Sequence, residues 1–529
     1  MTEKKGKKGE NGKSAAKDDS AADNPMTIEQ MATFCKKKGF VYLTAEIYGG
    51  LAGFFDYGHL GVELKNNIKS EWWKFHVLQR EDIVGMDGSI ITNPKVWKAS
   101  GHVECFEDMM VECSNCKARY RGDHLVEDEL KIAADGLGGD DIDRLLKENG
   151  IKCPNCGSDL GKAQQFNLMF ETNVGPLKDD NSRAYLRPET AQLIFTNFRL
   201  VQEHARLKLP FGIAQMGKAF RNEISPRDFL FRCREFEQME IEYFIHPEKA
   251  DECPFMDEIL DHKINVYSAE MQEKGRPHKQ MKMKDLVEKK VISTKWHAYW
   301  LATEHKWFVN LGASPERFRI RQHLKEEKSH YADDTWDLEY EFPFGWKELQ
   351  GMANRTDFDL KQHTLHSKKD LNIFDEEAKE KVIPHVVAEP SQGVDRAFLV
   401  FMFDAYEDDK ERGNVVLRLD PKLAPVKAGI FPLVSNKKEV LDLAKKVYGE
   451  IRDRLHCQLD TSGSIGRRYA RADETGIPYC ITIDFDSLDD DSVTIRDRDS
   501  TEQRRIRIKD LKETLTKLVE GSMSFSELT

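Results

Sequence analysis

The chain has 529 residues, which is too long for one hydrophobic core and predicts roughly three domains. Its composition, 40% hydrophobic and 33% charged, is typical of a globular protein, and no window approaches the ~18 consecutive apolar residues of a membrane span. The formal net charge of -12 means that total charge cannot argue for nucleic-acid binding, because phosphate contacts need Lys and Arg.

Residues 1–25 are rich in Lys, Gly, Ala, Asp and Ser and contain nothing that could pack, so we expect a disordered tail. The segment lacks the apolar run of a signal peptide and, unlike a transit peptide, has acidic residues and no Arg. We therefore expect a cytoplasmic protein with no membrane partner. Its cysteines should stay reduced and act as metal ligands or packing residues rather than as disulfides.

Helix and strand patterns are mixed from residue 26 to about residue 110. Leu64–His76 has a helical pattern, and the β-branched run Ile90–Thr92 leads to Asn93 and Pro94. The first pattern predicts a helix.

Residues 111–160 contain two Cys-x₂-Cys pairs, Cys113 with Cys116 and Cys153 with Cys156. Two such tight turns can place four thiolates around one tetrahedral Zn²⁺, in a zinc-ribbon-like insert with a structural role. The pairs are further apart than the ~15–20 residues of a common zinc ribbon, with a predicted small helix, Asp140–Asn149, between them. Two interpretations therefore stay open: a structural zinc site, or a ribbon that has lost its metal.

The longest part of the chain, residues 161–424, has strand-like runs at Phe211–Gln215, Met239–Ile245 and Phe398–Phe403. A Lys-rich stretch at about residues 251–303 is predicted to be a helical insertion. Asp420–Pro425 is the predicted linker to the last part of the chain.

Residues 425–529 predict a compact α/β domain with its own core. The domain should contain a strand, a one-faced helix, a second strand, a hairpin and a final helix, at Ala428–Val434, Val440–Leu455, Tyr479–Asp484, Val493–Ile508 and from about Lys509.

The segment Phe220–Phe244 predicts a long hairpin with interleaved arginines and phenylalanines: Arg221, Arg227, Phe231, Arg232, Arg234 and Phe236. Guanidinium groups match phosphate oxygens, and an aromatic face can stack on a base. On composition alone, a solvated edge hairpin with surface ion pairs explains the segment equally well.

The order of the residues resembles motif 2 of the class II aminoacyl-tRNA synthetases, here Phe220–Glu223 followed by Arg232–Phe236. Glu389–Arg396 followed by Ala397–Tyr406 is similar to motif 3. Leu64–His76 with Ile90–Pro94 is similar to motif 1, which implies a helix followed by a strand that ends at Pro94. The resemblance implies an α+β catalytic domain built on an antiparallel sheet over residues 26–424. It also implies a C-terminal α/β anticodon-binding domain over residues 425–529.

Within the class, the chain resembles the glycyl-tRNA synthetases of the homodimeric type from about Met26 onward. Besides motifs 2 and 3, the strings that carry this resemblance are Gly49–Tyr57, Leu186–Gln192 and Glu341–Leu360. The resemblance implies a glycine--tRNA ligase that joins glycine to ATP as glycyl-adenylate and releases pyrophosphate. Glycine then passes to the 3'-terminal adenosine of tRNA(Gly). The implied partners are ATP with Mg²⁺, glycine, tRNA(Gly) and a second copy of the chain.

The resemblance also implies site residues, and the catalytic ones are Arg221, Arg232 and Arg396. ATP contacts fall on Arg221, Asn222, Glu223, Phe231, Arg232, Cys233, Arg234, Glu235, Phe236, Glu348, Leu349, Gly393, Val394, Asp395 and Arg396. Glycine contacts fall on Arg121, Glu189, Phe236, Glu237, Gln238, Met239, Glu240, Glu389, Pro390, Ser391, Gln392 and Gly393. Cys113, Cys116, Cys153 and Cys156 would bind Zn²⁺, and Glu348 would bind Mg²⁺.

The implied roles are specific. Arg221 should hold the α-phosphate and the glycine carboxylate, Glu223 the adenine amino group and Arg232 the γ-phosphate. Phe236 should stack under adenine with Arg396 above it. Glu189 and Glu389, helped by Ser391, should bind the glycine ammonium, although either carboxylate could instead form a surface salt bridge.

Two other classes of function compete with this one: a binding subunit without activity, and a class II enzyme for another amino acid. A catalytically dead relative serving as a binding subunit should have lost motif arginines, but Arg221, Arg232 and Arg396 are present. A class II enzyme for serine, proline or threonine would not carry this combination of Leu-Arg-Pro-Glu-Thr and Glu-Pro-Ser-Gln-Gly. In the last domain, Arg467, Arg468, Tyr469 and Arg471 form a candidate basic surface for RNA phosphate, with a solvated helix face as the alternative.

Overall fold

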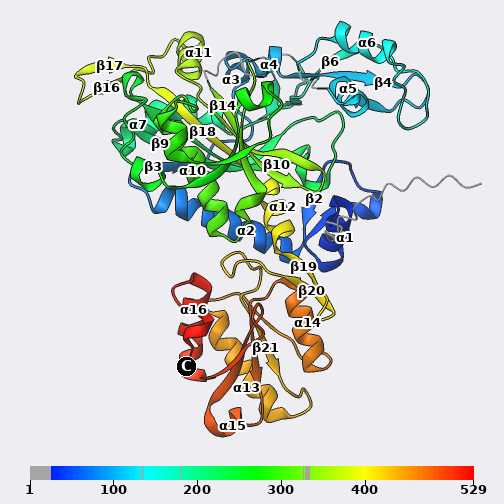
Figure 1. Ribbon diagram of the computed structural model, residues 1–529, viewed down its shortest axis with the longest axis vertical. Coiled ribbons are helices and arrows are strands. Elements are labelled where there is room, and N and C mark those ends of the chain that lie inside the picture. Colours follow the sequence, from blue (N-terminus) through cyan, green and yellow to red (C-terminus); the bar gives the residue numbers. More distant parts are fainter. Residues whose placement is uncertain are drawn as a thin grey trace, which may run out of the picture.

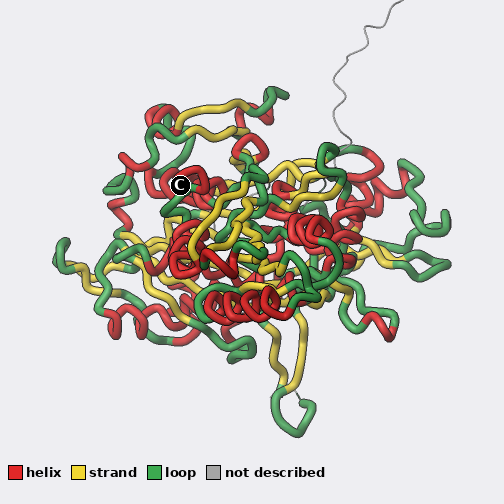
Figure 2. The backbone as a smooth tube through the Cα atoms, turned by 90° about the horizontal axis from the view of Figure 1, so that it is seen from below, coloured by secondary structure: helices red, strands yellow, loops and turns green. Residues whose placement is uncertain are grey.

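The computed structural model describes residues 26–528 apart from 133, 135, 180–181, 326 and 328–333, so the predicted tail at residues 1–25 lies outside the described residues. A larger N-terminal domain lies above a smaller C-terminal domain in Figure 1, and Figure 2 views the molecule from the C-terminal end. No helix among the described residues is long and apolar enough to cross a membrane.

Nine strands of the described chain form the central sheet, which is antiparallel apart from the pairs β3–β9 and β11–β13. In sheet order they are β12 (Lys279–Lys282), β11 (Lys263–Tyr267), β13 (Phe318–Gln322), β14 (Thr335–Phe342), β15 (Gly345–Ala353), β18 (His385–Gly393), β10 (Glu235–Ile245), β9 (Phe211–Phe220) and β3 (Ile83–Met86).

One face of this sheet is covered by long helices (Figure 1). Leu64, Ile68 and Trp72 of α2 (His59–Trp73) and Trp300 of α10 (Lys295–Asn310) are fully buried there. The helix α12 (Val394–Ala405) joins the same core, with α1 (Ile28–Lys38) and the π-helical turn η2 (Lys74–Leu78) at its edge. The core fixes the sheet from below and leaves part of its other face for the site.

The opposite face is covered at one end by α7 (Ala191–Ala205) and α11 (Phe358–Ser367). The smaller elements of this domain are β1 (Val41–Leu43), β2 (Phe55–Tyr57), α3 (Lys95–Ala99), α4 (His102–Cys105), β7 (Phe170–Asn173), β8 (Arg183–Leu186), α8 (Ala269–Glu273), α9 (Met283–Glu288), β16 (Ile373–Asp375), β17 (Glu380–Val382), β19 (Tyr406–Asp409) and β20 (Asn414–Leu417).

The cysteine pairs lie in a small subdomain with its own apolar core. It contains a three-stranded sheet, β5-β4-β6, and two helices: β4 (Glu107–Glu112), β5 (Arg119–Arg121), β6 (Gln164–Asn167), α5 (Gly122–Leu130) and α6 (Gly139–Glu148). The predicted helix between the two pairs is confirmed as α6.

The C-terminal domain has the predicted order of elements and a separate apolar core. Its five-stranded sheet has the order β22-β21-β23-β24-β25. The elements are β21 (Ala428–Pro432), α13 (Lys438–Arg452), β22 (Cys457–Leu459), α14 (Ile465–Thr475), β23 (Tyr479–Ile483), α15 (Ser487–Asp490), β24 (Ser492–Asp497), β25 (Gln503–Arg507) and α16 (Ile508–Glu520).

The connection between the two domains is packed rather than loose. Leu423 and Ala424 of the predicted linker are fully buried, and the Asn67 side chain of α2 donates to both of their carbonyls at 3.1 and 3.0 Å. Leu423 and Phe431 belong to the same apolar cluster as the core of the catalytic domain. The main core therefore continues across the domain joint.

Three predictions of secondary structure are wrong. Phe398–Phe403 reads as a strand because it is continuously apolar, but it lies inside α12, which is buried on nearly all sides and so needs no polar face. The stretch at about residues 251–303 is not wholly helical, since β11 and β12 extend the central sheet from it. β11 and β12 are only five and four residues long, so each offers little alternation by which to recognise it.

The predicted strand at Ile90–Asn93 is also wrong. The strand after α2 is β3, and Ile91 makes only an isolated bridge to Leu186. Pro94 caps the short helix α3 instead of ending a strand. Position 85 in β3 requires a glycine, because a Cβ there would come within 2.2 Å of the Trp73 ring at the end of α2.

Candidate active site

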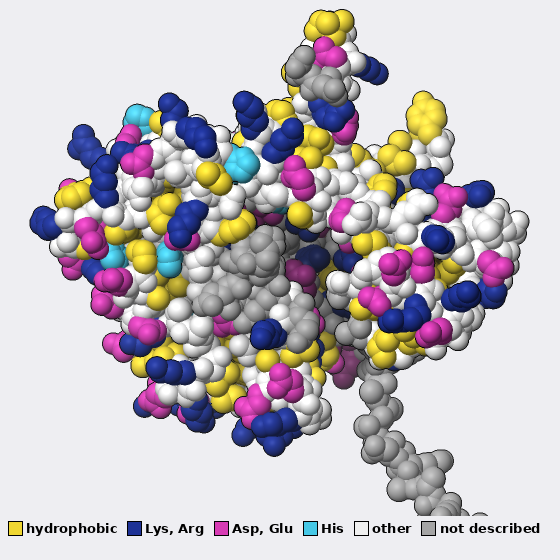
Figure 3. Space-filling model, turned by 90° about the horizontal axis from the view of Figure 1, so that it is seen from above, with side chains coloured by type: hydrophobic (Ala, Val, Ile, Leu, Met, Phe, Trp, Pro, Cys, Tyr) yellow, Lys and Arg dark blue, Asp and Glu magenta, His cyan; other side chains and the backbone are white. Residues whose placement is uncertain are grey.

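A cavity of about 840 Å³ opens over β10, β15 and β18, on the face of the sheet opposite α10. From the end of the molecule opposite the C-terminal domain, the surface is hollowed, with acidic and basic side chains in the hollow (Figure 3). Sixteen of the predicted residues line the cavity: Glu189, Arg221, Glu223, Phe231, Arg232, Cys233, Phe236, Gln238, Glu240, Glu348, Leu349, Glu389, Ser391, Gly393, Asp395 and Arg396.

The alternation of β10 decides which side chains reach the cavity. Met239, Ile241 and Tyr243 point to the apolar core, so Phe236, Gln238, Glu240 and Glu242 occupy the opposite face. β10 pairs with β18 so that Gln238 lies opposite Gly393 and Glu240 opposite Ser391. The segments predicted as motifs 2 and 3 are thus neighbouring strands that build one floor.

The same alternation explains why some predicted residues are outside the lining. Met239 and Gln392 are fully buried, and Glu237 is paired with Lys65 and Lys69 of α2, below the sheet. The other predicted residues that do not line the cavity are Arg121, Asn222, Arg234, Glu235, Pro390 and Val394. Arg121 is instead paired with Asp108 at 3.1 Å and with Asp123, in the cysteine subdomain.

Three arginines lie at the motif 2 end of the cavity. Arg221 follows β9 and places its guanidinium carbon 5.3 Å from the Phe236 ring centre and 5.5 Å from that of Phe106, while its Nε donates to the Pro188 carbonyl at 3.1 Å. The Nη1 atom of Arg232 lies 3.8 Å from Oε2 of Glu223. The Arg396 guanidinium carbon lies 4.5 Å from the centre of the Phe231 ring.

The hairpin differs in detail from its prediction. β9 ends at Phe220, so Arg221 and Glu223 are not on a strand, and the turn contains a short 3-10 helix, Phe229–Phe231. Arg234 points away from the cavity and donates to the carbonyls of Glu223 and Ala52 at 2.9 Å each. Its role is therefore to hold the turn against the Gly49–Tyr57 segment.

Asp337 and Glu348 form a carboxylate pair on β14 and β15. A Cβ on Gly351 would have Glu348 Oε1 at 3.7 Å and Asp337 Oδ1 at 3.9 Å, so both oxygens face the same spot. Burial raises the pKa of Asp337 to about 6, against the effect of His323, whose Nε2 lies 2.8 Å away. The Arg396 Nη1 atom lies 3.2 Å from Glu348. Oxygen donors of this kind suit Mg²⁺.

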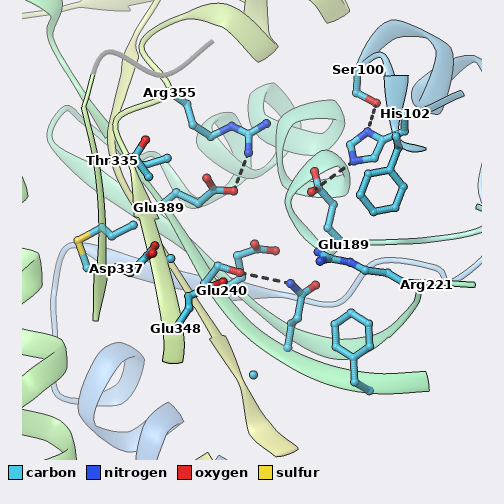
Figure 4. Close-up of a pocket in the computed structure, with 18 of the residues that line it drawn as sticks. Ser100, His102, Glu189, Arg221, Glu240, Thr335, Asp337, Glu348, Arg355 and Glu389 are labelled. Atoms are coloured by element: carbon cyan, nitrogen blue, oxygen red, sulfur yellow. Dashed lines mark hydrogen bonds and ion pairs between the residues drawn. The ribbon is translucent and has the colours of Figure 1, made fainter. Parts of the chain in front are cut away.

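The other end of the cavity is acidic (Figure 4). Glu240 and Glu389 are almost fully buried, and Glu189 is partly buried. Glu240 accepts a hydrogen bond from Thr190. Arg355 donates to Glu389 at 2.8 Å and to both oxygens of Asp359 at 2.7 and 2.9 Å. Burial raises the pKa of Glu389 to about 8, since the single guanidinium only partly offsets it.

A chain of side chains holds Glu189 from outside the sheet. The His102 ring nitrogens lie 2.8 Å from Ser100 Oγ and 3.4 Å from Glu189 Oε2 (Figure 4). Burial disfavours the charged form of Glu189, but His102 and then Arg355 outweigh it and hold the pKa of this carboxyl well below its usual range. Arg187, nearly fully buried, anchors the segment by donating to the Gly88 and Lys218 carbonyls at 2.6 Å each.

Sequence reasoning missed Ser100, His102, Asp337, Arg355 and Glu242. Arg355 and Asp337 lie within or next to the Glu341–Leu360 string, but nothing in the local pattern separates them from surface charges. Glu242 follows Glu240 by two residues, so strand alternation could have placed both on one face. His102 gives no local signal, because only the tertiary fold brings it to Glu189.

The four paired cysteines come together in the small subdomain. All four Sγ atoms lie within 4.8 Å of one another, with Cys113 to Cys156 at 3.5 Å and Cys116 to Cys153 at 3.6 Å. Zn–S bonds of about 2.3 Å in a tetrahedron require S···S distances of just under 4 Å. The cluster therefore fits a structural zinc ion.

The predicted basic surface of the C-terminal domain needs correction at Arg468. This side chain is only 1% exposed and donates to the carbonyls of Pro432, Thr461 and Gly463. It faces inward because it satisfies the carbonyls that end β21 and precede α14. Arg467 remains exposed, and Arg471 is paired with Asp460.

Two family models match the chain. The "tRNA synthetase class II core domain (G, H, P, S and T)" matches residues 170–402, and the "Anticodon binding domain" matches residues 427–518. A solved prolyl-tRNA synthetase from Cryptosporidium parvum, in complex with halofuginone and AMPPNP, is 14% identical with a TM-score of 0.55. The match covers 93% of this chain and 75% of that one, and supports the class II fold alone.

Curated relatives are much closer in sequence. A "Glycine--tRNA ligase" from Ruminiclostridium cellulolyticum is 46% identical over 494 residues, which are 92% of this chain and 97% of the relative. One of the same name from Bacillus cereus is 45% identical over 502 residues, covering 93% and 99%. The predicted fold class is therefore confirmed, and the chain belongs to the glycine--tRNA ligase family of class II tRNA synthetases.

Proposed function

We propose that the cavity activates glycine with ATP, and that the enzyme then transfers glycine from the adenylate to the 3'-terminal adenosine of tRNA(Gly). The observation that carries this proposal is the polarity of one cavity: three arginines and two aromatic rings lie at one end, and three glutamates lie at the other. Such a site can bind a nucleoside triphosphate beside a small zwitterion such as glycine.

At the ATP end, the enzyme must hold the reactants in line and neutralise the charge that develops on the α-phosphate. Arg221 is the group assigned to the α-phosphate and the glycine carboxylate. Glu223 is assigned to the adenine amino group and Arg232 to the γ-phosphate. The rings of Phe231 and Phe236 offer faces to adenine, and Arg396 lies over the first of them.

ATP would enter with Mg²⁺ as its substrate complex, and Glu348 with Asp337 is the carboxylate pair that would hold the ion. When bound, Mg²⁺ neutralises phosphate charge. Glu348 was expected from the sequence, whereas Asp337 is added here because its Oδ1 atom faces the same spot.

At the glycine end, the ammonium group is assigned to Glu189, Glu240 and Glu389, with Ser391 beside them. Arg355 and His102 position Glu389 and Glu189 from outside the cavity. Glycine has no side chain for the site to recognise. The site must therefore select glycine by excluding larger amino acids sterically.

The remaining assignments concern the assembly. The four-cysteine cluster is proposed to bind zinc with a structural role, and residues 427–518 to bind the tRNA anticodon region. A cytoplasmic homodimer is proposed, supported by Ile90 and Ile91, which are exposed beside Pro94. A monomer by light scattering at micromolar concentration would contradict the dimer.

One assay tests the proposed activity directly. ATP–pyrophosphate exchange is measured on the full-length enzyme with glycine, alanine, serine, proline and threonine in turn. Exchange should depend on glycine and be at least about 100-fold weaker with alanine or serine. The side chain of either amino acid must clash with the acidic end of the cavity, formed by Glu189, Glu240 and Glu389. Equal exchange with alanine would refute the glycine assignment, and no exchange with any amino acid would refute the enzymatic one.

A further inference from the structure

Glu242 is a buried carboxyl group that the proposed reaction does not use. It lies on β10 two residues beyond Glu240, on the face that carries the cavity floor, and is 0% exposed. Neither of its carboxylate oxygens has a hydrogen-bond partner among the described residues. One oxygen from each of Glu240, Glu242 and Glu389 lies within 4.8 Å of the other two. Glu242 therefore forms a second layer behind the acidic end of the cavity.

The register explains this crowding. Glu240 pairs with Ser391 and Tyr243 with Ala388, so Glu242 and Glu389 lie on adjacent strands between those two pairs. Like charges at such positions destabilise a sheet, and an unpaired buried carboxylate costs far more. Glu242 and Glu389 nevertheless lie where their negative charges cannot both be solvated.

The local charges do not balance if every carboxyl group is ionised. Glu242 faces Glu389 on β18, Glu240 on its own strand, Arg355 and Asp359. Arg355 is the cation of this group, and three of its five N–H donors bind Asp359 and Glu389. Glu189, held by His102, adds another negative charge nearby. A buried cluster with this excess of carboxyl groups retains protons.

The direction of the pKa shifts agrees with that count. Burial, followed by the charge of Glu389, raises the pKa of Glu242 well above its ordinary value. Burial likewise raises the pKa of Glu389 to about 8 and raises that of Glu240. At neutral pH, Glu242 and Glu389 are therefore largely neutral before the substrate arrives.

We propose that glycine binds in exchange for a proton: Glu389 releases its proton to solvent as the substrate ammonium arrives, while Glu242 stays protonated behind it and supports the new carboxylate. The idea rests on the proposed function, because it requires the ammonium group to bind at Glu189, Glu240 and Glu389. Glu242 is then a positioning residue. It supplies a neutral O–H donor where a second negative charge would oppose Glu389.

The exchange makes glycine affinity depend on pH. A carboxyl group with a pKa of about 8 is roughly 3% ionised at pH 6.5 and about half ionised at pH 8. The KM for glycine in the exchange assay should therefore fall by about 15-fold from pH 6.5 to pH 8, with a much smaller change in kcat and in the KM for ATP. The glycine ammonium itself stays protonated across this range.

Calorimetry measures the proton directly. Glycine is titrated into the full-length enzyme at pH 7 in two buffers of different protonation enthalpy, and the difference in heat gives the protons released. We expect about one proton per bound glycine. Measurable binding with no proton released would overturn the proposal, whether the cluster is fully ionised or already neutralised by another cation. A complete lack of glycine binding would instead contradict the proposed function.

Substitutions separate the two glutamates. Glu242→Gln keeps a neutral donor of the same shape, so the glycine KM should stay within about twofold of the parent and keep its pH dependence. Glu242→Leu removes the donor and should raise the glycine KM without altering the KM for ATP. Glu389→Gln should abolish both the proton release and the pH dependence. If Glu242→Gln impairs glycine binding as strongly as Glu242→Leu, Glu242 acts as an anion and the proposal fails.

Glu304 offers a matched control. It is also a fully buried glutamate, but it lies on α10 beneath the sheet and is paired with His76 at 2.8 Å. Glu304→Gln should leave the number of protons released by glycine unchanged, even if it lowers thermal stability. Loss of proton release in this variant would show that the effect is not local to the cavity.

Discussion

Replacing Arg221 with alanine should remove most of the catalytic power of the first step. The Nε of this side chain donates to the Pro188 carbonyl, and its guanidinium lies beside the rings of Phe106 and Phe236. The two Nη groups are therefore left for a phosphate and a carboxylate. Two charge-assisted hydrogen bonds contribute about 1.5–3 kcal/mol each, so the loss is about 4 kcal/mol, or roughly 10³-fold in rate.

Glycine-dependent ATP–pyrophosphate exchange measures this loss, as kcat/KM. Arg221→Lys keeps the charge but loses the planar fork and the stacking on the rings, so it should recover only about 1–2 kcal/mol. Lys218→Ala is the control, because Lys218 lies on the same hairpin but is half-exposed and paired with Glu235. Exchange by Arg221→Ala within about tenfold of the parent would refute the assignment.

The remaining predictions concern other parts of the molecule. Metal analysis of the purified enzyme should find about one zinc per chain, and Cys116→Ser should lower both that content and the thermal stability of residues 107–167; well under one zinc in the parent would contradict the site. Glu348→Gln should raise the Mg²⁺ concentration needed for half-maximal exchange, and an unchanged Mg²⁺ dependence would remove this residue as a ligand. Asp473→Asn should cost about 3–5 kcal/mol of stability, because it leaves Arg496, at 2.8 and 3.0 Å, without its buried partner; an unchanged melting temperature would show that this ion pair contributes nothing.

The sequence could predict the elements whose pattern follows from burial on one face. The helix α13 shows clean spacing because it has one apolar and one solvated face, and the hairpin of β24 and β25 shows it because Val493, Ile495 and Ile506 alternate with polar side chains. The pattern fails in α12, where almost every side chain is buried, and in β11 and β12, which are only five and four residues long.

The sequence predicts some residues of the site and misses others, for a related reason. Motif order identified Arg221, Phe236 and Glu389, which line the cavity. Runs such as Glu237–Glu240 were predicted whole, yet strand alternation gives the cavity only half of such a run. Residues that act from a distance, such as His102 and Arg355, have no local signature, since their importance comes from which carboxylate the tertiary fold sets beside them.

The packed joint between the two domains has a consequence for substrate selection. Leu423 and Phe431 share one apolar cluster with the catalytic domain, and the Lys38 side chain of α1 reaches Glu474 of α14. The spacing between the C-terminal domain and the cavity is therefore set by side-chain packing rather than by a flexible linker. Under the proposed function, a tRNA must span that spacing to place its anticodon region on one domain and its 3' end in the cavity of the other.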